Sequence, residues 1–240
     1  MSVFASLVER LADLLQPLFG ASAAAAAIVL FTALVRLLVH PLSRAAARGQ
    51  KARTALQPRI AELRRKHAKN PERLQRAVLE LHAEEKVSPL SGCLPSLFQL
   101  PAFFLLYHLF SSSSIGGEAN ALLSHRLLDA PLGGRWADAL GGAGPFGGAG
   151  LVYAVLFVFV AGVALFSYRL TRRTMAANPV PPGAGGTDGQ QAPGLGAITR
   201  VMPFMSFFTL VTVAVVPLAA ALYVVTSTTW SAVERAVLHR

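Results

Sequence analysis

One arginine stands out as the residue of this chain whose position could support chemistry. Arg36 lies inside an otherwise apolar stretch, residues 21–39, which has the ~20 residues that a membrane-spanning helix needs. An ionisable side chain within such a helix is costly, and it is by default a candidate functional group. The alternative is that Arg36, four residues before His40, extends to the lipid headgroups and only anchors the helix.

Uncharged polar side chains within the other apolar stretches are the remaining candidates. Thr32 lies one turn before Arg36, and similar residues recur at helical spacing near the C-terminus. Packed together, such faces would line a polar, water-holding groove, although Ser and Thr faces also serve as ordinary helix contacts. The candidate groove residues are Thr32, Arg36, Ser96, Gln99, Ser206, Thr209, Tyr223, Ser227 and Trp230.

The chain lacks the groupings that catalysis inside a membrane requires. Paired carboxylates, a nucleophile beside a base, or clustered metal ligands would be needed, and the predicted spans contain no Asp or Glu. Cys93 is the single cysteine, so an internal disulfide is excluded, and its neighbours do not have metal-ligand spacing. We therefore expect no enzyme, no metal and no cofactor. Ion-coupled transport is also disfavoured, because it usually leaves carboxylates within the membrane.

Composition predicts an all-α polytopic membrane protein with five transmembrane helices. The 240 residues are 53% hydrophobic, with a mean hydropathy of +0.50, and the charges are bunched between apolar runs. The last two spans come from one apolar run, which we divide at Pro217; a single long tilted helix is the alternative. Residues 1–20 are expected to form an amphipathic interfacial helix, and residues 234–240 a short tail. The predicted spans are residues 21–39, 93–110, 151–168, 198–215 and 217–233.

The basic residues predict how the chain is oriented. Residues 40–92 hold 12 of the 22 Lys and Arg residues, whereas residues 111–150 hold only Arg126 and Arg135. By the positive-inside rule, the N-terminus is outside and the C-terminus is cytoplasmic. The net charge of +10 is mostly this topology signal, so we expect no specific DNA binding, although lipid headgroups or ribosomal RNA remain possible partners.

The loops between the spans differ in character. Residues 58–86 are predicted to form a cytoplasmic helical hairpin, because Pro58 and Pro71 each suit a first helical turn and Asn70 is a good N-cap. A solvated charged linker is the alternative. Residues 178–196 are rich in Pro, Gly and small polar residues, which is typical of a flexible linker. In the outer segment, residues 122–128 are expected to form a short interfacial helix.

Several short motifs lie between residues 32 and 234. They are Arg36 with Pro41, Leu-Gln-Pro at 56–58, Asn-Pro-Glu at 70–72, Lys86-Val87-x-Pro89, Gly-Cys-Leu-Pro at 92–95, Gln99-x-Pro101, Met-Pro-Phe at 202–204, Pro217 and Leu222-Tyr223. This combination resembles the conserved core of the YidC/Oxa/Alb membrane protein insertases over residues 32–234. Two departures are Val224 and Thr228, where the family often has Trp and Asn. The short tail after Glu234 lacks the long basic extension of some members, which argues against strong autonomous ribosome binding.

The resemblance implies a compact, Gram-positive-type bacterial insertase in the plasma membrane. Its five core helices would enclose a hydrophilic groove that opens to the cytoplasm and lipid, is closed on the outer side, and carries Arg36. The implied partners are nascent membrane proteins, the Sec translocon, the ribosome or targeting machinery, and membrane lipids. A small channel or transporter and a structural partner of the Sec translocon are the alternatives. The hairpin residues expected to meet substrates are Pro58, Arg59, Arg64, Arg65, Pro71, Glu72 and Arg73.

Overall fold

The structure is a computed structural model, and the part that it describes is mostly helical. The described residues are 2–68, 70–87, 104, 107–115, 117–142, 144–177 and 202–238. The helices are α1 (Ser2–Phe19), η1 (Gly20–Ser22), α2 (Ala23–Lys66), α3 (Pro71–Glu84), η3 (Ala121–Ser124), α5 (Trp136–Gly141), α6 (Gly148–Ala177), η4 (Met202–Phe207), α8 (Phe208–Val215) and α9 (Leu218–Leu238). Two short antiparallel pairs join β1 (Ser114–Ile115) to β2 (Glu118–Ala119) and β3 (Arg126–Leu127) to β4 (Ala130–Pro131).

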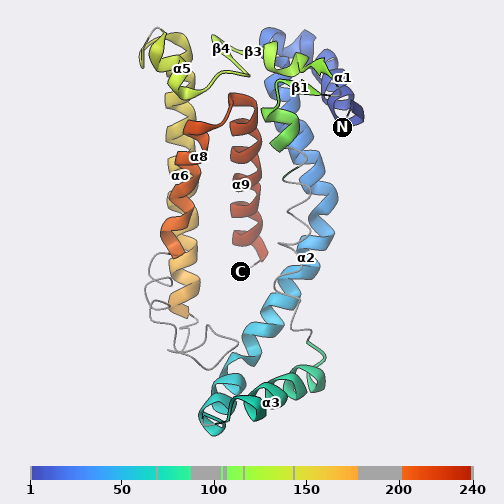
Figure 1. The fold of residues 1–240 in the computed structure, drawn as a ribbon, viewed down its shortest axis with the longest axis vertical. Coiled ribbons are helices and arrows are strands. Elements are labelled where there is room, and N and C mark those ends of the chain that lie inside the picture. Colours follow the sequence, from blue (N-terminus) through green and yellow to red (C-terminus); the bar gives the residue numbers. More distant parts are fainter. Residues whose placement is uncertain are drawn as a thin grey trace.

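Helix α9 lies between α2 on one side and α6 with α8 on the other (Figure 1). The helices α2, α6 and α9 run in the same direction, and α8 runs in the opposite direction (Figure 1). The strands, α1 and α5 gather at one end, which we call the strand end, and α3 lies at the other (Figure 1). The basic C-terminal part of α2 and α3 therefore lie at the opposite end of the molecule from the strands.

Two helical segments, Ser6–Lys66 and Gly148–Ala176, are long and apolar enough to cross a membrane. A shorter apolar helix covers Phe204–Val215, and Tyr168 of α6 packs on its Phe204 ring at 5.3 Å between centroids. The predicted span at residues 93–110 lies mostly outside the described residues, and the linker at 178–196 lies wholly outside them.

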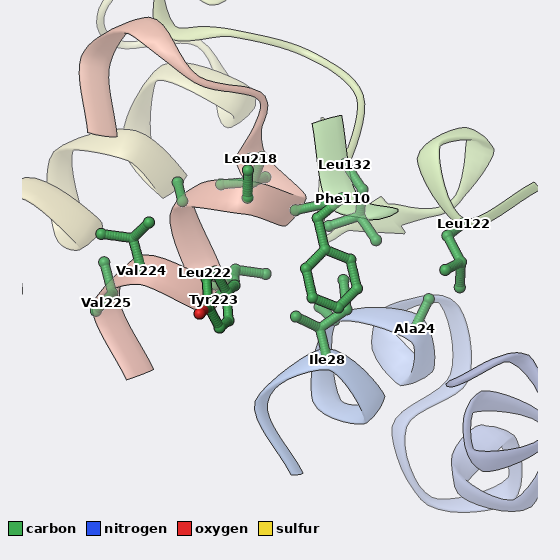
Figure 2. Close-up of a cluster of buried hydrophobic side chains, with 14 of the residues drawn as sticks. Ala24, Ile28, Phe110, Leu122, Leu132, Leu218, Leu222, Tyr223, Val224 and Val225 are labelled. Atoms are coloured by element: carbon green, nitrogen blue, oxygen red, sulfur yellow. The ribbon is translucent and has the colours of Figure 1, made fainter. Parts of the chain in front are cut away.

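The main hydrophobic core sits at the strand end of the molecule. Ile28, Phe110, Leu132, Leu218 and Tyr223 are all nearly inaccessible to solvent there (Figure 2). The rings of Phe110 and Tyr223 lie 6.0 Å apart between centroids. Large buried side chains from distant parts of the sequence thus close this end of the helix bundle.

The loop after β4 also accepts hydrogen bonds from the first backbone N–H groups of α9. The first backbone N–H groups of a helix have no partner within the helix. Here the Leu218 N–H donates to the Gly134 carbonyl at 2.9 Å, and the Ala219 N–H donates to the Leu132 carbonyl at 2.9 Å. The Tyr153 hydroxyl of α6 donates to the same Gly134 carbonyl at 2.6 Å. One loop therefore joins α6 and α9 at the strand end.

The division of the last apolar run at Pro217 is confirmed. Helix α8 ends at Val215 and α9 begins at Leu218, because Pro217 has no N–H with which to continue the hydrogen-bond ladder. The start of α3 is confirmed as well. Its first residue is Pro71, and the Asn70 side chain accepts a hydrogen bond from the Arg73 N–H at 3.0 Å.

The expectation that Pro58 opens a helix was wrong. Helix α2 runs from Ala23 to Lys66 and contains Pro58 in its interior. Leu56 before the proline and Ile60 after it both pack in one cluster with Leu81 of α3. This packing continues the helical stripe on both sides of Pro58, and it outweighs the cost of one missing backbone hydrogen bond.

The outer segment also differs from its prediction. Instead of a helix at residues 122–128, the chain forms η3 and then β3, and Leu128 has a left-handed φ of 53° that a helix does not permit. The short helix α5 was not predicted. Its start is marked by Asp138, whose carboxylate accepts a hydrogen bond from the Arg135 N–H at 2.9 Å, as in a capping box.

Replacing Gly150 with alanine is expected to destabilise the strand end. A Cβ at Gly150 would lie 2.5 Å from the Pro145 carbonyl oxygen, which is backbone and must shift. We expect a loss of about 1–3 kcal/mol, measured as a lower midpoint of thermal unfolding in detergent. Gly162→Ala in the same helix is the control, since its Cβ meets open space. The control should be neutral or stabilising by up to about 1 kcal/mol, and equal losses in both variants would contradict this account.

Candidate functional site

Arg36 contacts α9 through its side chain. Its guanidinium Nη2 donates a hydrogen bond to the Ser227 hydroxyl. Ser227 is 7% exposed and Arg36 is half-buried. The side chain therefore crosses to a neighbouring helix instead of extending along α2 toward a membrane surface. This contact favours a role for Arg36 between the helices over the anchoring alternative.

A second polar pair lies one turn further along α2. His40 Nδ1 and Glu234 Oε1 are 2.7 Å apart, and the Glu234 side chain is only 11% exposed. Arg36 also interacts electrostatically with Tyr223 and Glu234. Two cationic or ionisable groups on α2 thus face a carboxylate, a phenol and a hydroxyl on α9.

Helical spacing explains why these groups meet. Arg36 and His40 are four residues apart on α2. On α9, Tyr223, Ser227 and Glu234 follow at intervals of four and seven residues, so they share one face. Both contacts advance in the same direction along the two helices, which agrees with the parallel course of α2 and α9 (Figure 1).

Thr32 does not offer its hydroxyl proton to this site. It is 1% exposed, and its Oγ1 donates to the Ile28 carbonyl of its own helix at 2.7 Å. Several α9 hydroxyls donate to carbonyls of their own helix in the same way, namely those of Thr226, Thr228, Thr229 and Ser231. Such internal bonds satisfy hydroxyls within an apolar setting. Ser227 differs from them, because its oxygen accepts from Arg36.

The other predicted groove residues lie elsewhere. Trp230 is half-buried on α9. Ser206 and Thr209 are half-buried on η4 and α8, on the opposite side of α9 from α2 (Figure 1). Ser96 and Gln99 fall outside the described residues. The structure thus brings Arg36, Tyr223 and Ser227 together, whereas Ser206 and Thr209 lie on other elements, η4 and α8.

Glu234 and His40 were missed by the sequence analysis. The predicted last span ends at residue 233, so Glu234 lies one residue beyond it. A usable signal was present, because Glu234 continues the stripe of Tyr223, Ser227 and Trp230 at helical spacing.

The C-terminal part of α2 and α3 form a separate small cluster. Leu56, Ile60 and Leu81 are buried there, and Arg59 pairs with Glu85 across the two helices. That pair is largely exposed and adds little stability. The predicted contact residues Pro58, Arg59, Arg65, Pro71, Glu72 and Arg73 are exposed, and Arg64 is half-buried.

Comparison with known proteins gives concordant matches. A sequence model of the family described as "60Kd inner membrane protein" matches residues 14–240. A protein named "Membrane protein insertase YidC" from Clostridium perfringens is 44% identical over 84 residues, which are 35% of this chain and 35% of that protein. The proteins of the same name from Chlorobium limicola and Anaeromyxobacter sp. are 40% and 41% identical over 36% of this chain, covering 15% and 16% of their own lengths. The chain therefore matches about a third or less of the length of these relatives.

Proposed function

Because this chain belongs to the 60Kd inner membrane protein family, we propose that it is a membrane protein insertase and chaperone of the bacterial plasma membrane. It places newly made membrane proteins into the bilayer through a hydrophilic groove, alone or together with the Sec translocon. The observation that carries this proposal is the placement of Arg36, a cation in an apolar helix, against the polar face of α9.

Arg36 attracts the acidic, hydrophilic segment of a substrate. The attraction between opposite charges about 4 Å apart rises from about 1 kcal/mol in water to about 4 kcal/mol in a partly desolvated site. The half-buried position of Arg36 supports such a site. The attraction to Arg36 thereby replaces part of the hydration that the substrate's polar segment loses when it leaves the cytoplasm.

The substrate's apolar helix moves into lipid along the open side of the groove. Burial of apolar surface, at about 25 cal/mol per Å², drives this step without ATP. The packed core at the strand end supports a groove that is closed on the outer side. No catalytic group and no cofactor enter this scheme.

We place the strand end outside the cell and α3 in the cytoplasm. Five crossings then run alternately through the membrane, with residues 1–20 at the outer surface and residues 234–240 in the cytoplasm. The direction of α2, α6, α8 and α9 supports this arrangement (Figure 1). The exposed basic side chains of α2 and α3 supply the positive charge expected on the cytoplasmic side.

The α2–α3 hairpin, residues 58–86, makes the first contact with partners. Its exposed charges suit nascent chains, targeting machinery or the ribosome, and anionic lipid headgroups lie close by. Its small core suggests that it moves more readily than the main bundle.

Complementation tests the proposed function in cells. A bacterial strain that is depleted of its own insertase should resume growth when it expresses this chain, and a membrane reporter should again be inserted. The empty vector is the control, and the amount of chain in the membrane is followed by immunoblot. Failure to restore growth and reporter insertion, at full expression, would count against an insertase.

A further inference from the structure

Helix α2 carries a row of basic side chains that continues well beyond the site. Arg36, His40, Arg44 and Arg48 are four residues apart, and Lys51 follows three residues later. These five residues, which we call the basic ladder, belong to one uninterrupted helix. Each of these residues is therefore the surface neighbour of the next, and the row turns gradually around the helix, by about 40° for each four-residue step. At 1.5 Å per residue, neighbouring rungs are about 6 Å apart and the ladder is about 22 Å long.

The three outer rungs are open to a ligand. Arg44, Arg48 and Lys51 are exposed. Together with Pro41 and Ala47 they line a hollow of about 400 Å³. The ion pairs recorded among the described residues are His40 with Glu234 and Arg59 with Glu85. In that part of the chain, therefore, no carboxylate pairs with the outer rungs.

The two inner rungs, Arg36 and His40, already have a carboxylate beside them. Glu234 contacts His40 and interacts electrostatically with Arg36. A carboxylate of the chain itself thus occupies the inner end of the ladder. The outer rungs present the same kind of positive charge without that partner.

We propose that the basic ladder binds an acidic, extended segment of the substrate and guides it along α2 to Arg36, where it displaces Glu234. This inference rests on the proposed insertase function and adds a recognition surface to it. In an extended chain, side chains at alternate positions lie on one side and about 6.6 Å apart. That spacing is close to the distance between rungs, so acidic residues at alternate positions match the ladder best.

A lipid headgroup fits the ladder less well than a peptide. The headgroup layer is about 5–8 Å thick on each side of the bilayer, so lipids reach one or two rungs at a time. The ladder extends about 22 Å along α2, toward the end of the molecule that carries α3 (Figure 1). An extended peptide of about seven residues spans that length.

A binding experiment tests the ladder directly. The full chain is reconstituted in zwitterionic vesicles, with and without anionic lipid, and titrated with a fluorescent peptide in which Asp alternates with Ser. The triple variant Arg44→Gln, Arg48→Gln, Lys51→Gln should bind this peptide about tenfold more weakly than the parent chain.

A matched triple variant controls for net charge. Arg169, Arg172 and Arg173 are exposed near the end of α6, so their replacement by Gln removes the same charge from another helix. Peptide binding by this control should change less than twofold. A peptide with its Asp residues in one block should bind the parent chain more weakly than the alternating one.

Each result bears on one claim. Equal weakening by both triple variants would overturn the ladder, because it would reflect net charge alone. If the ladder variant changes only the association with anionic lipid, the ladder binds lipid headgroups, and the proposed binding of an acidic peptide is overturned. If the parent chain binds the alternating peptide in the expected way but inserts no substrate, the ladder stands and the proposed function fails. If the ladder variant binds the peptide as well as the parent chain does and inserts substrates normally, the ladder is overturned and the proposed function stands.

Discussion

Arg36→Ala is expected to lower the insertion of substrates with acidic outer segments by at least about tenfold, whereas Arg36→Lys retains most of it. Alanine removes the positive charge from a half-buried position between α2 and α9, and a charge pair there is worth several times more than in water. Lysine keeps the charge. The measurement is protease protection of an acidic and a neutral single-span substrate made in the presence of each variant.

Ser227→Ala is the matched control for Arg36→Ala. It removes the same hydrogen bond between α2 and α9 but leaves the guanidinium in place. If Arg36 acts through its charge, Ser227→Ala should affect insertion far less than Arg36→Ala. Equal losses would mean that Arg36 only ties the two helices together. Normal insertion of every substrate by Arg36→Ala would reduce it to an interfacial anchor or indicate a structural partner of the translocon.

Deletion of residues 58–86 is expected to cripple insertion while the remaining helices still integrate into the membrane. Leu56, Ile60 and Leu81 form a cluster of their own, separate from the main core. The deletion therefore removes the exposed basic contact surface without opening the bundle at the strand end. Growth of a depleted strain reports function, and resistance to alkaline extraction reports membrane integration.

Two leucines of α3 provide a finer test of the hairpin. Leu81 is buried in the cluster, whereas Leu79 is 54% exposed. Leu81→Asp places a charge in the packed contact and should reproduce part of the deletion's defect. Leu79→Asp introduces the same charge at the surface and should be tolerated. Normal growth with the deletion would exclude the hairpin from insertion.

The sequence predicted correctly those structural features that depend on a few neighbouring residues. The break at Pro217 and the Asn70 cap of α3 depend on residues that are close in sequence. Pro58 failed because the local rule for proline competes with packing: Leu56 and Ile60 hold α2 together across it through contact with Leu81. The two-residue strands near Leu128 are too short to show any periodicity.

The candidate site was predicted only in part, because some of its residues have a local sequence signal and others depend on contacts between distant residues. Arg36 could be found from its setting alone, since it is a charge within an apolar run. Its partner Ser227 lies 191 residues further along the chain, so spacing suggested a polar face but could not pair the two residues. Thr32 was a candidate by type, and its hydroxyl donates within its own helix. Glu234 was lost because hydropathy places the end of a span only to within a few residues.

Reconstitution with Arg36 variants tests the central claim most directly. Proteoliposomes that contain only this chain, as wild type, Arg36→Ala or Arg36→Glu, receive a short single-span substrate with an acidic outer tail. We predict insertion by the wild type and its loss in both variants, with Arg36→Glu the more severe because it repels the tail. Equal insertion by all three folded proteins would contradict the account, because Arg36 would then lie outside the path of the substrate.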